Sequence, residues 1–234
     1  MDDKDFINGD NANPTVFNNP KDSDIILEFG CHQVYAHRAI LRMCLNSQFP
    51  VATSAVFNIV HDSPEDLMPI YAMLKHVYGM PSGIHPKNTR FYHAENEHEL
   101  MYSIRVYMLS DIYDVPSARN AAISAVKNLL DECTGSDTLG EEDHRAVAEC
   151  VMKLCGPGAP QLADSKLRNT LFSWLSDNFH FVTRNPEFKA KIENGSLLDT
   201  ELTAKLLFAL SAQIASPPRK KRRVQTVYLR SEHP

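Results

Sequence analysis

Histidine, acidic and cysteine side chains are the residues of this chain that could bind a metal or catalyse a reaction. Four ligand-type residues lie close together in the sequence: His93, Glu95, Glu97 and His98. They could gather a surface metal, but such a density of polar residues is more typical of a solvated linker into the next helix. His98-Glu99 also begins like a zinc-protease helix, yet Tyr102 stands where the second histidine ligand is required. We therefore predict no metal site.

Other patterns typical of catalysis are missing from the sequence. The chain has no Cys-x-x-Cys pair, no Gly-x-Ser-x-Gly turn and no Gly-rich phosphate loop. Cys150 and Cys155 do not share a helix face well, so we expect both as small core residues. The prediction is a non-enzymatic protein without a cofactor. The alternative is an enzyme that uses Cys or His chemistry in an unfamiliar helical fold.

A run of five consecutive basic residues is the most specific short motif. It consists of Arg219, Lys220, Lys221, Arg222 and Arg223. The two prolines before it disfavour a helix, and repulsion between the like charges keeps the segment extended. An extended basic peptide fits the acidic pockets of an import receptor, so we predict a nuclear-import signal. A contact to nucleic acid or anionic lipid, and an inert solvated run, are the alternatives.

The charge balance disfavours nucleic-acid binding by the rest of the chain. The 234 residues have a formal net charge of −5. Residues 216–234 carry six basic residues and one acidic residue, a net charge of +5, so the other 215 residues carry −10. Phosphate contacts need a basic surface, which an acidic body does not offer. We therefore expect protein partners and no nucleic acid. A nuclear DNA-associated regulator is an alternative that only the basic segment supports.

The composition is typical of a globular protein, with 43% hydrophobic and 23% charged residues. The uninterrupted apolar runs are far shorter than the ~18 to 20 residues that cross a bilayer, so we expect neither a membrane span nor a membrane partner. The start Met1–Asp5 has neither the basic nor the apolar region of a secretory signal. Together with an odd count of five cysteines, this predicts free thiols and a protein of the nucleus or cytoplasm that is not secreted.

Hydrophobic periodicity predicts an α+β fold. Alternating apolar residues on both sides of Gly30 predict a β-hairpin, and Phe57 and Ile59 predict a short strand. Helices are predicted after His37, from a cap at Ser63 to Gly79, over residues 98–115 and from Pro116 to about 130, with a long loop over 80–96. Residues 131–142 are a predicted subdomain boundary, after which all segments are helical. Ile112 is assigned to the apolar side of its helix, as are Leu202, Leu206, Leu210 and Ile214 in the last helix.

Four segments carry a resemblance to a known family. They are Asp22–Leu27, Val34–Leu41, Ser47–Phe49 and Val106–Pro116. With these residues the chain resembles a BTB/POZ domain over residues 21–131. Residues 184–188 and the leucine-rich last helix resemble the C-terminal helical extension of fungal BTB proteins. The predicted organisation is a mobile acidic arm (1–20), the BTB/POZ-like domain (21–131), a helical extension (132–215) and a basic flexible tail (216–234).

The resemblance implies a helical cluster flanked by a short β-sheet and followed by an all-α C-terminal extension. Proteins with this domain are binding modules that commonly form homodimers and act as adaptors of cullin-type ubiquitin ligases or as scaffolds in nuclear regulation. We therefore expect a homodimer that recruits a partner protein. A ligase substrate adaptor is the alternative, but the short stretch Thr53–Val56 lacks the apolar-x-acidic element of the cullin binders. A cullin is accordingly the less favoured partner.

The resemblance also implies particular site residues. The charged pocket of the family corresponds to Asp24 and Arg38, and its motif residues correspond to His37, Tyr113 and Asp114. A buried carboxylate and guanidinium would have to pair and be hydrogen-bonded. The alternative is that both are only partly buried and have a structural role.

Overall fold

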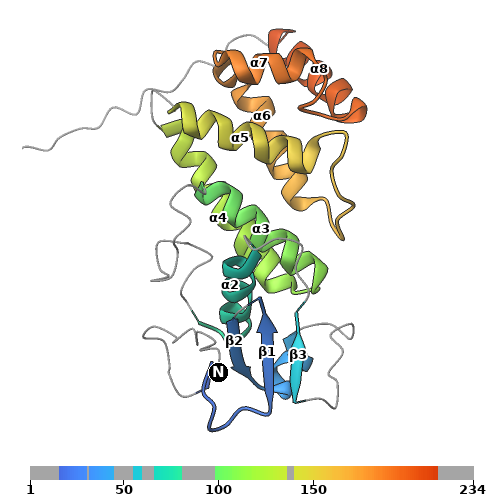
Figure 1. Cartoon of the computed structure of the whole chain (residues 1–234). Coiled ribbons are helices and arrows are strands. Elements are labelled where there is room, and N and C mark those ends of the chain that lie inside the picture. Colours follow the sequence, from blue (N-terminus) through green and yellow to red (C-terminus); the bar gives the residue numbers. More distant parts are fainter. Residues whose placement is uncertain are drawn as a thin grey trace, which may run out of the picture.

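The computed structural model describes residues 16–30, 32–44, 55–59, 66–80, 98–135 and 140–215. These residues form a three-stranded sheet and eight helices (Figure 1), so the predicted α+β class is confirmed. The strands are β1 (Ile25–Phe29), β2 (His32–Ala36) and β3 (Val56–Asn58). The helices are α1 (Arg38–Cys44), α2 (Leu67–Val77), α3 (Glu99–Ile112), α4 (Pro116–Gly135), α5 (Glu141–Cys155), α6 (Lys166–Val182), α7 (Pro186–Glu193) and α8 (Thr200–Ala215). Figure 1 shows the sheet at one end of an elongated molecule and α5 to α8 at the other.

The predicted hairpin is present and forms the middle and one edge of the sheet. β1 pairs with β2 antiparallel and with β3 parallel, which gives the strand order β2-β1-β3. Along β1 the buried side chains of Ile25, Leu27 and Phe29 alternate with less buried ones. Because successive strand residues point to opposite faces, this alternation puts the apolar residues on the face that packs against the helices. The β-pattern of the sequence therefore fixes which side of the sheet joins the core.

Helix α2 ends just before Gly79, as the sequence predicted. Gly79 has a φ of +68°, a conformation that residues with a Cβ rarely adopt. Its backbone N–H donates to the carbonyl of His76 over 2.9 Å, and the next N–H, of Met80, donates to the carbonyl of Lys75 over 3.2 Å. These bonds satisfy carbonyls that the helix itself leaves unpaired at its C-terminus. The helix begins at Leu67, and the cap predicted at residue 63 lies outside the described residues.

Two hydrophobic clusters make up the core, and α2 and α3 contribute to both. The sheet-side cluster joins the strands to α1 and α2, with Leu27, Leu41 and Leu74 fully buried. The helix-side cluster extends from Ala72 of α2 through α3 and α4 to Leu206 of α8. It therefore continues across residues 131–142, where the sequence suggested a boundary. The described residues after that point, up to residue 215, form the helices α5 to α8 and no strand, in agreement with the prediction.

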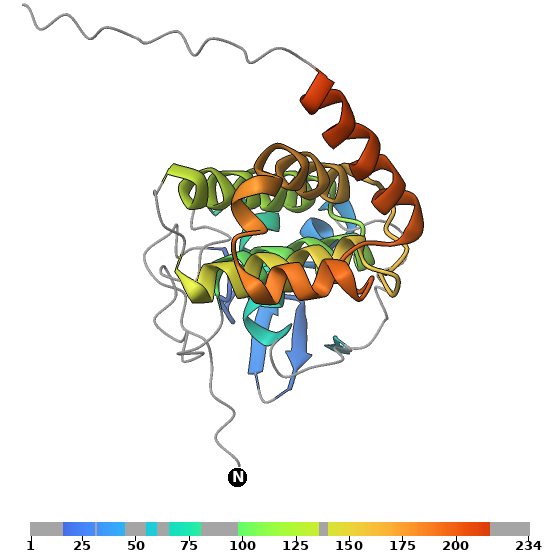
Figure 2. The same cartoon turned by 90° about the horizontal axis from the view of Figure 1, so that it is seen from above.

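Two apolar residues are exposed where the sequence predicted burial, so their assignment to the core was wrong. Ile112 is 63% exposed because it is the last residue of α3, and Ile214 is 87% exposed near the end of α8. Leu202 and Leu206, in the first half of α8, are buried against the body, and Leu210 is half-buried against the same cluster. Figure 2 shows the second half of α8 extending past the other helices. Apolar residues recur at the helical period along the whole of α8. The other helices bury only the first part of it.

Several expectations fall on residues outside the described ranges. These are the acidic arm up to residue 15, the loop over 81–97, residues 45–54 of the family resemblance, and the basic tail from residue 216. Within the described ranges, no helix has the combination of length and hydrophobicity needed to cross a bilayer.

Candidate functional site

The structure brings Asp24 and Arg38 together at the start of α1. The Asp24 carboxylate accepts the backbone N–H of Arg38 over 2.8 Å, and the Arg38 Nε donates to the backbone carbonyl of Asp24 over 3.2 Å. The carboxylate therefore satisfies a donor in the first turn of α1, a position where negative charge is stabilising. Asp24 is exposed and Arg38 half-buried, so the contact between them lies at the protein surface.

His37 lies beside this pair and is anchored by Tyr78, a partner that the sequence did not suggest. The Tyr78 hydroxyl accepts the backbone N–H of His37 over 2.7 Å and lies 3.3 Å from its Nδ1. The ring of Tyr78 also packs on Phe17, with ring centroids 4.9 Å apart. Burial raises the pKa of Tyr78 to about 12, which keeps the phenol neutral. The contact holds the hairpin against the C-terminal end of α2.

The other motif residues, Tyr113 and Asp114, form the corner between α3 and α4. Tyr113 is half-buried and packs against the sheet-side cluster. Asp114 has a φ of +49°, a left-handed conformation that aspartate tolerates better than most residues. Its carboxylate accepts the Arg119 Nη2 over 3.0 Å. Both residues therefore stand at the turn between the two helices.

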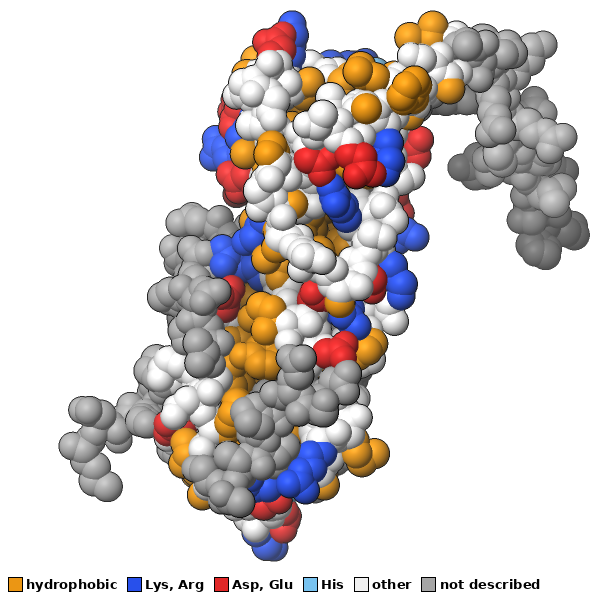
Figure 3. Space-filling model, turned by 90° about the vertical axis from the view of Figure 1, so that its right-hand side faces the viewer, with side chains coloured by type: hydrophobic (Ala, Val, Ile, Leu, Met, Phe, Trp, Pro, Cys, Tyr) orange, Lys and Arg blue, Asp and Glu red, His pale blue; other side chains and the backbone are white. Residues whose placement is uncertain are grey.

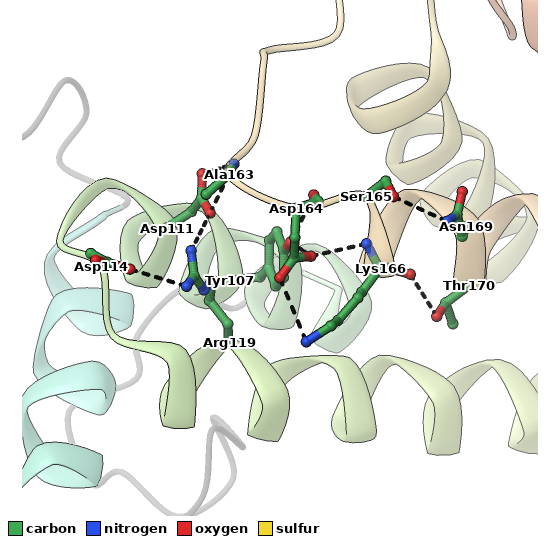
Figure 4. Close-up of polar contacts among 10 residues, drawn as sticks. All are labelled: Tyr107, Asp111, Asp114, Arg119, Ala163, Asp164, Ser165, Lys166, Asn169 and Thr170. Carbon is green, nitrogen blue, oxygen red and sulfur yellow. Dashed lines mark hydrogen bonds and ion pairs between the residues drawn. The ribbon is translucent and has the colours of Figure 1, made fainter.

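Arg119 is the centre of a polar network that connects this corner to the helical extension (Figure 4). Only 8% of Arg119 is exposed, and its Nη1 donates to Asp111 over 2.8 Å. The same Asp111 carboxylate accepts the backbone N–H of Ala163, in the loop before α6, over 3.0 Å. Three charged residues and one backbone donor are thus paired in one place. Sequence periodicity has no signal for contacts between residues about fifty positions apart.

Tyr107 and Asp164 extend the network toward α6. The Tyr107 hydroxyl donates to the Asp164 carboxylate over 3.0 Å, and the same carboxylate accepts the backbone N–H of Lys166 over 2.9 Å. Burial, together with the neighbouring carboxylate, raises the pKa of Tyr107. Burial works to raise the pKa of Asp164, but these two hydrogen bonds outweigh it and lower that pKa. Both pKa shifts favour a neutral phenol that donates to a charged carboxylate. This pairing is a structural one.

A cleft of about 430 Å³ lies between α4 and α6, and no pattern in the sequence indicated it. It is lined by Lys127, Leu130, Asp131, Asn169, Thr170, Ser173, Trp174 and Asp177. The Trp174 Nε1 donates to the backbone carbonyl of Leu130 over 3.1 Å and thereby joins the two helices. The lining combines hydroxyl, amide and charged groups with one aromatic ring. Such a surface can hydrogen-bond a polar segment.

The residues singled out for metal or thiol chemistry have structural environments. His98 caps α3: its Nδ1 accepts the N–H of Leu100 over 3.2 Å, and its Nε2 lies 3.0 Å from Asp143 of α5. His93, Glu95 and Glu97 lie outside the described residues. Among the residues that the structure does describe, no group of three His, Cys, Asp or Glu is placed to hold a metal. Cys150 and Cys155 are buried core residues, as predicted.

Comparison with models of known protein families finds no match for the chain. A search of the curated proteins finds no match either. The BTB/POZ resemblance, and the roles that it implies for Asp24, Arg38, His37, Tyr113 and Asp114, therefore stay predictions. So does the import signal, since Arg219, Lys220, Lys221, Arg222 and Arg223 lie outside the described residues.

Proposed function

We propose that this chain is a non-enzymatic interaction module of BTB/POZ type, which self-associates through its hairpin and α1 and recruits a partner protein in the nucleus. The observation that carries the proposal is the exposed methionine of α1. Met43 is 85% exposed on this short helix, next to the hairpin that the Asp24–Arg38 contact holds in place. Exposed methionine is frequent at protein-binding surfaces because its flexible side chain adapts to a partner.

The environment of two of the thiols argues against their use as nucleophiles. Reactive cysteines have lowered pKa values and partial exposure. Burial instead raises the pKa of Cys133 and of Cys155 to about 11 in each case. At neutral pH these two thiols are protonated and therefore weak nucleophiles.

Replacing Met43 by Asp is expected to dissociate the dimer. A carboxylate at the centre of an apolar contact loses its hydration without gaining a partner, so we expect dimerisation to weaken by at least about tenfold. Size-exclusion chromatography with light scattering at micromolar concentration measures the mass directly. Ile112→Asp is the matched control, since Ile112 is also apolar and exposed but lies on α3. A monomeric wild-type chain, or a dimer that Met43→Asp leaves intact, would contradict the proposal.

Substitution of the two lysines in the basic run tests whether the run directs nuclear import. We expect that Lys220→Ala with Lys221→Ala abolishes nuclear accumulation of the full chain fused to a fluorescent protein too large for passive entry. The control replaces Arg145 and Lys189, two exposed cations of α5 and α7, by Ala and keeps accumulation intact. Equal accumulation of both variants would refute the import role. A salt-sensitive complex with duplex DNA that only the first variant loses would favour the DNA-associated alternative instead.

A further inference from the structure

The cleft between α4 and α6 offers polar groups to a ligand and little apolar surface. Six of its eight lining residues are polar or charged. The two others, Leu130 and Trp174, are only 1% and 8% exposed, so most of the accessible lining is polar. Pockets for small molecules are instead lined mainly by apolar and aromatic side chains. The cleft is therefore better suited to a hydrogen-bonding peptide than to a small apolar molecule.

The two helices that form the cleft run in the same direction, as their first turns show in Figure 4. Near their starts, Asp111 joins Arg119 of α4 to Ala163, which lies just before α6. Eleven residues further along each segment, the Trp174 Nε1 donates to the carbonyl of Leu130. Because both intervals have the same length, the two helices stay in step along the cleft.

This arrangement gives the cleft an acidic end and a basic end. Asp131 directly follows Leu130, and Asp177 lies about one turn after Trp174, so both carboxylates lie at the end away from Arg119. Lys127 lies one turn earlier in α4, which is about 6 Å along the helix axis. A ligand that follows the cleft therefore meets charges of opposite sign about one helical turn apart.

Asp177 and Lys127 are exposed charges that no neighbouring side chain neutralises. On the face drawn in Figure 3, acidic and basic side chains lie close to one another. Exposed acids such as Glu187 and Glu201 each pair with a lysine one turn away in their own helix. Among the described residues, no ion pair includes the Asp177 carboxylate or the Lys127 ammonium group. Both charges are thus available to a ligand.

We infer that the cleft between α4 and α6 binds an extended peptide that carries a basic and an acidic side chain two residues apart. The basic side chain pairs with Asp177 and is attracted by Asp131, and the acidic one pairs with Lys127. Alternate side chains of an extended peptide share a face and are about 6.5 Å apart, which matches the helical turn between the charges. A nucleic acid fits less well, because two carboxylates repel its phosphates.

Tryptophan fluorescence of the full chain tests the inference, because Trp174 is the only tryptophan and lines the cleft. The probes are the capped peptides Ala-Glu-Ala-Arg-Ala and Ala-Arg-Ala-Glu-Ala, which cover both directions of binding. We expect one of them to change the emission saturably, with a dissociation constant below about 1 mM. The same peptides with Gln in place of Glu and Arg should have no effect. If neither charged peptide binds, the inference is wrong.

Reversal of one charge in the cleft shows whether the peptide binds there. Asp177→Lys should weaken binding by at least about tenfold, because it places a like charge beside the peptide's arginine. The same variant should bind Ala-Glu-Ala-Glu-Ala more tightly than the wild type does, a gain that an unfolded variant cannot produce. Glu149→Lys, at an exposed acid of α5, is the matched control and should bind as the wild type. Equal effects of the two substitutions would overturn the inference.

The result is separable from the proposed function, which the inference goes beyond, because the cleft belongs to α4 and α6 and not to the hairpin or α1. Met43→Asp should therefore bind the peptide as the wild type does. Loss of peptide binding in this variant would place the peptide at the α1 surface and contradict the inference. A chain that forms the dimer but binds neither peptide would refute the inference alone.

Discussion

Arg119→Met is expected to destabilise the folded chain by about 3 kcal/mol. The substitution removes the guanidinium that pairs with Asp111 and Asp114 and leaves the carboxylate of Asp111, whose side chain is 10% exposed, without its cation. Breaking a buried ion pair from one side typically costs about 3 to 5 kcal/mol, and the lower end applies because Asp114 is better solvated and Asp111 keeps the N–H of Ala163. Urea unfolding followed by circular dichroism gives the free energy of unfolding.

The double substitution Arg119→Met with Asp111→Asn separates charge from packing. Asparagine keeps an acceptor for the N–H of Ala163 but carries no charge, so the double variant should be more stable than Arg119→Met alone. Arg145→Ala serves as the control, because this exposed arginine should change the free energy of unfolding by less than about 0.5 kcal/mol. If Arg119→Met and Arg145→Ala have equal effects, the network does not stabilise the junction.

Trp174→Ala is expected to destabilise the chain by about 3 to 5 kcal/mol, the range for removing a buried large aromatic side chain. Trp174 is only 8% exposed and lies in α6, while its hydrogen-bond acceptor Leu130 lies in α4. Trp174→Phe should cost about 1 kcal/mol, because it keeps an aromatic ring but leaves the Leu130 carbonyl without this donor. Urea unfolding monitored by circular dichroism compares the variants.

The same experiment tests whether residues 21–131 and 132–215 unfold separately. The helix-side cluster contains residues of α3 and α4 as well as of α5 to α8, so we expect one cooperative transition. Trp174 is the only tryptophan and lies where α6 contacts α4, so its fluorescence in the wild-type chain reports on the junction between the two parts, while circular dichroism reports on all helices. Coincident transitions are the expected result. A fluorescence transition that precedes the loss of the remaining helices would show that the extension is an independent unit.

Local patterns predicted most of the elements correctly. The alternation of Ile25, Leu27 and Phe29 gave β1, and Gly79 and Pro116 marked the end of α2 and the start of α4. These features depend on the conformational preferences of single residues and on the period of apolar side chains, both of which act over a few neighbours. Burial of Cys150 and Cys155 was predicted from residue type, since free cysteine behaves as a small hydrophobic residue.

Contacts between distant segments were not predictable from the period of apolar residues. Tyr78 as the partner of His37, Asp164 as the partner of Tyr107, and the cleft beside Trp174 each join residues more than forty positions apart or two separate helices. Their geometry depends on how whole helices pack, which periodicity leaves open. The exposed Asp24 is a related case: the sequence suggested its pairing with Arg38 but could not decide its burial.

The sequence by itself therefore determined the α+β class, the positions of the main helices and strands, and the separation of an acidic body from a basic end. Tertiary structure alone decided that the core continues from α3 to α8, and that Ile214 of α8 faces outward. The physical reason is that a helical period indicates only which side chains share a face. Whether another surface is present to bury that face depends on the arrangement of all the helices together.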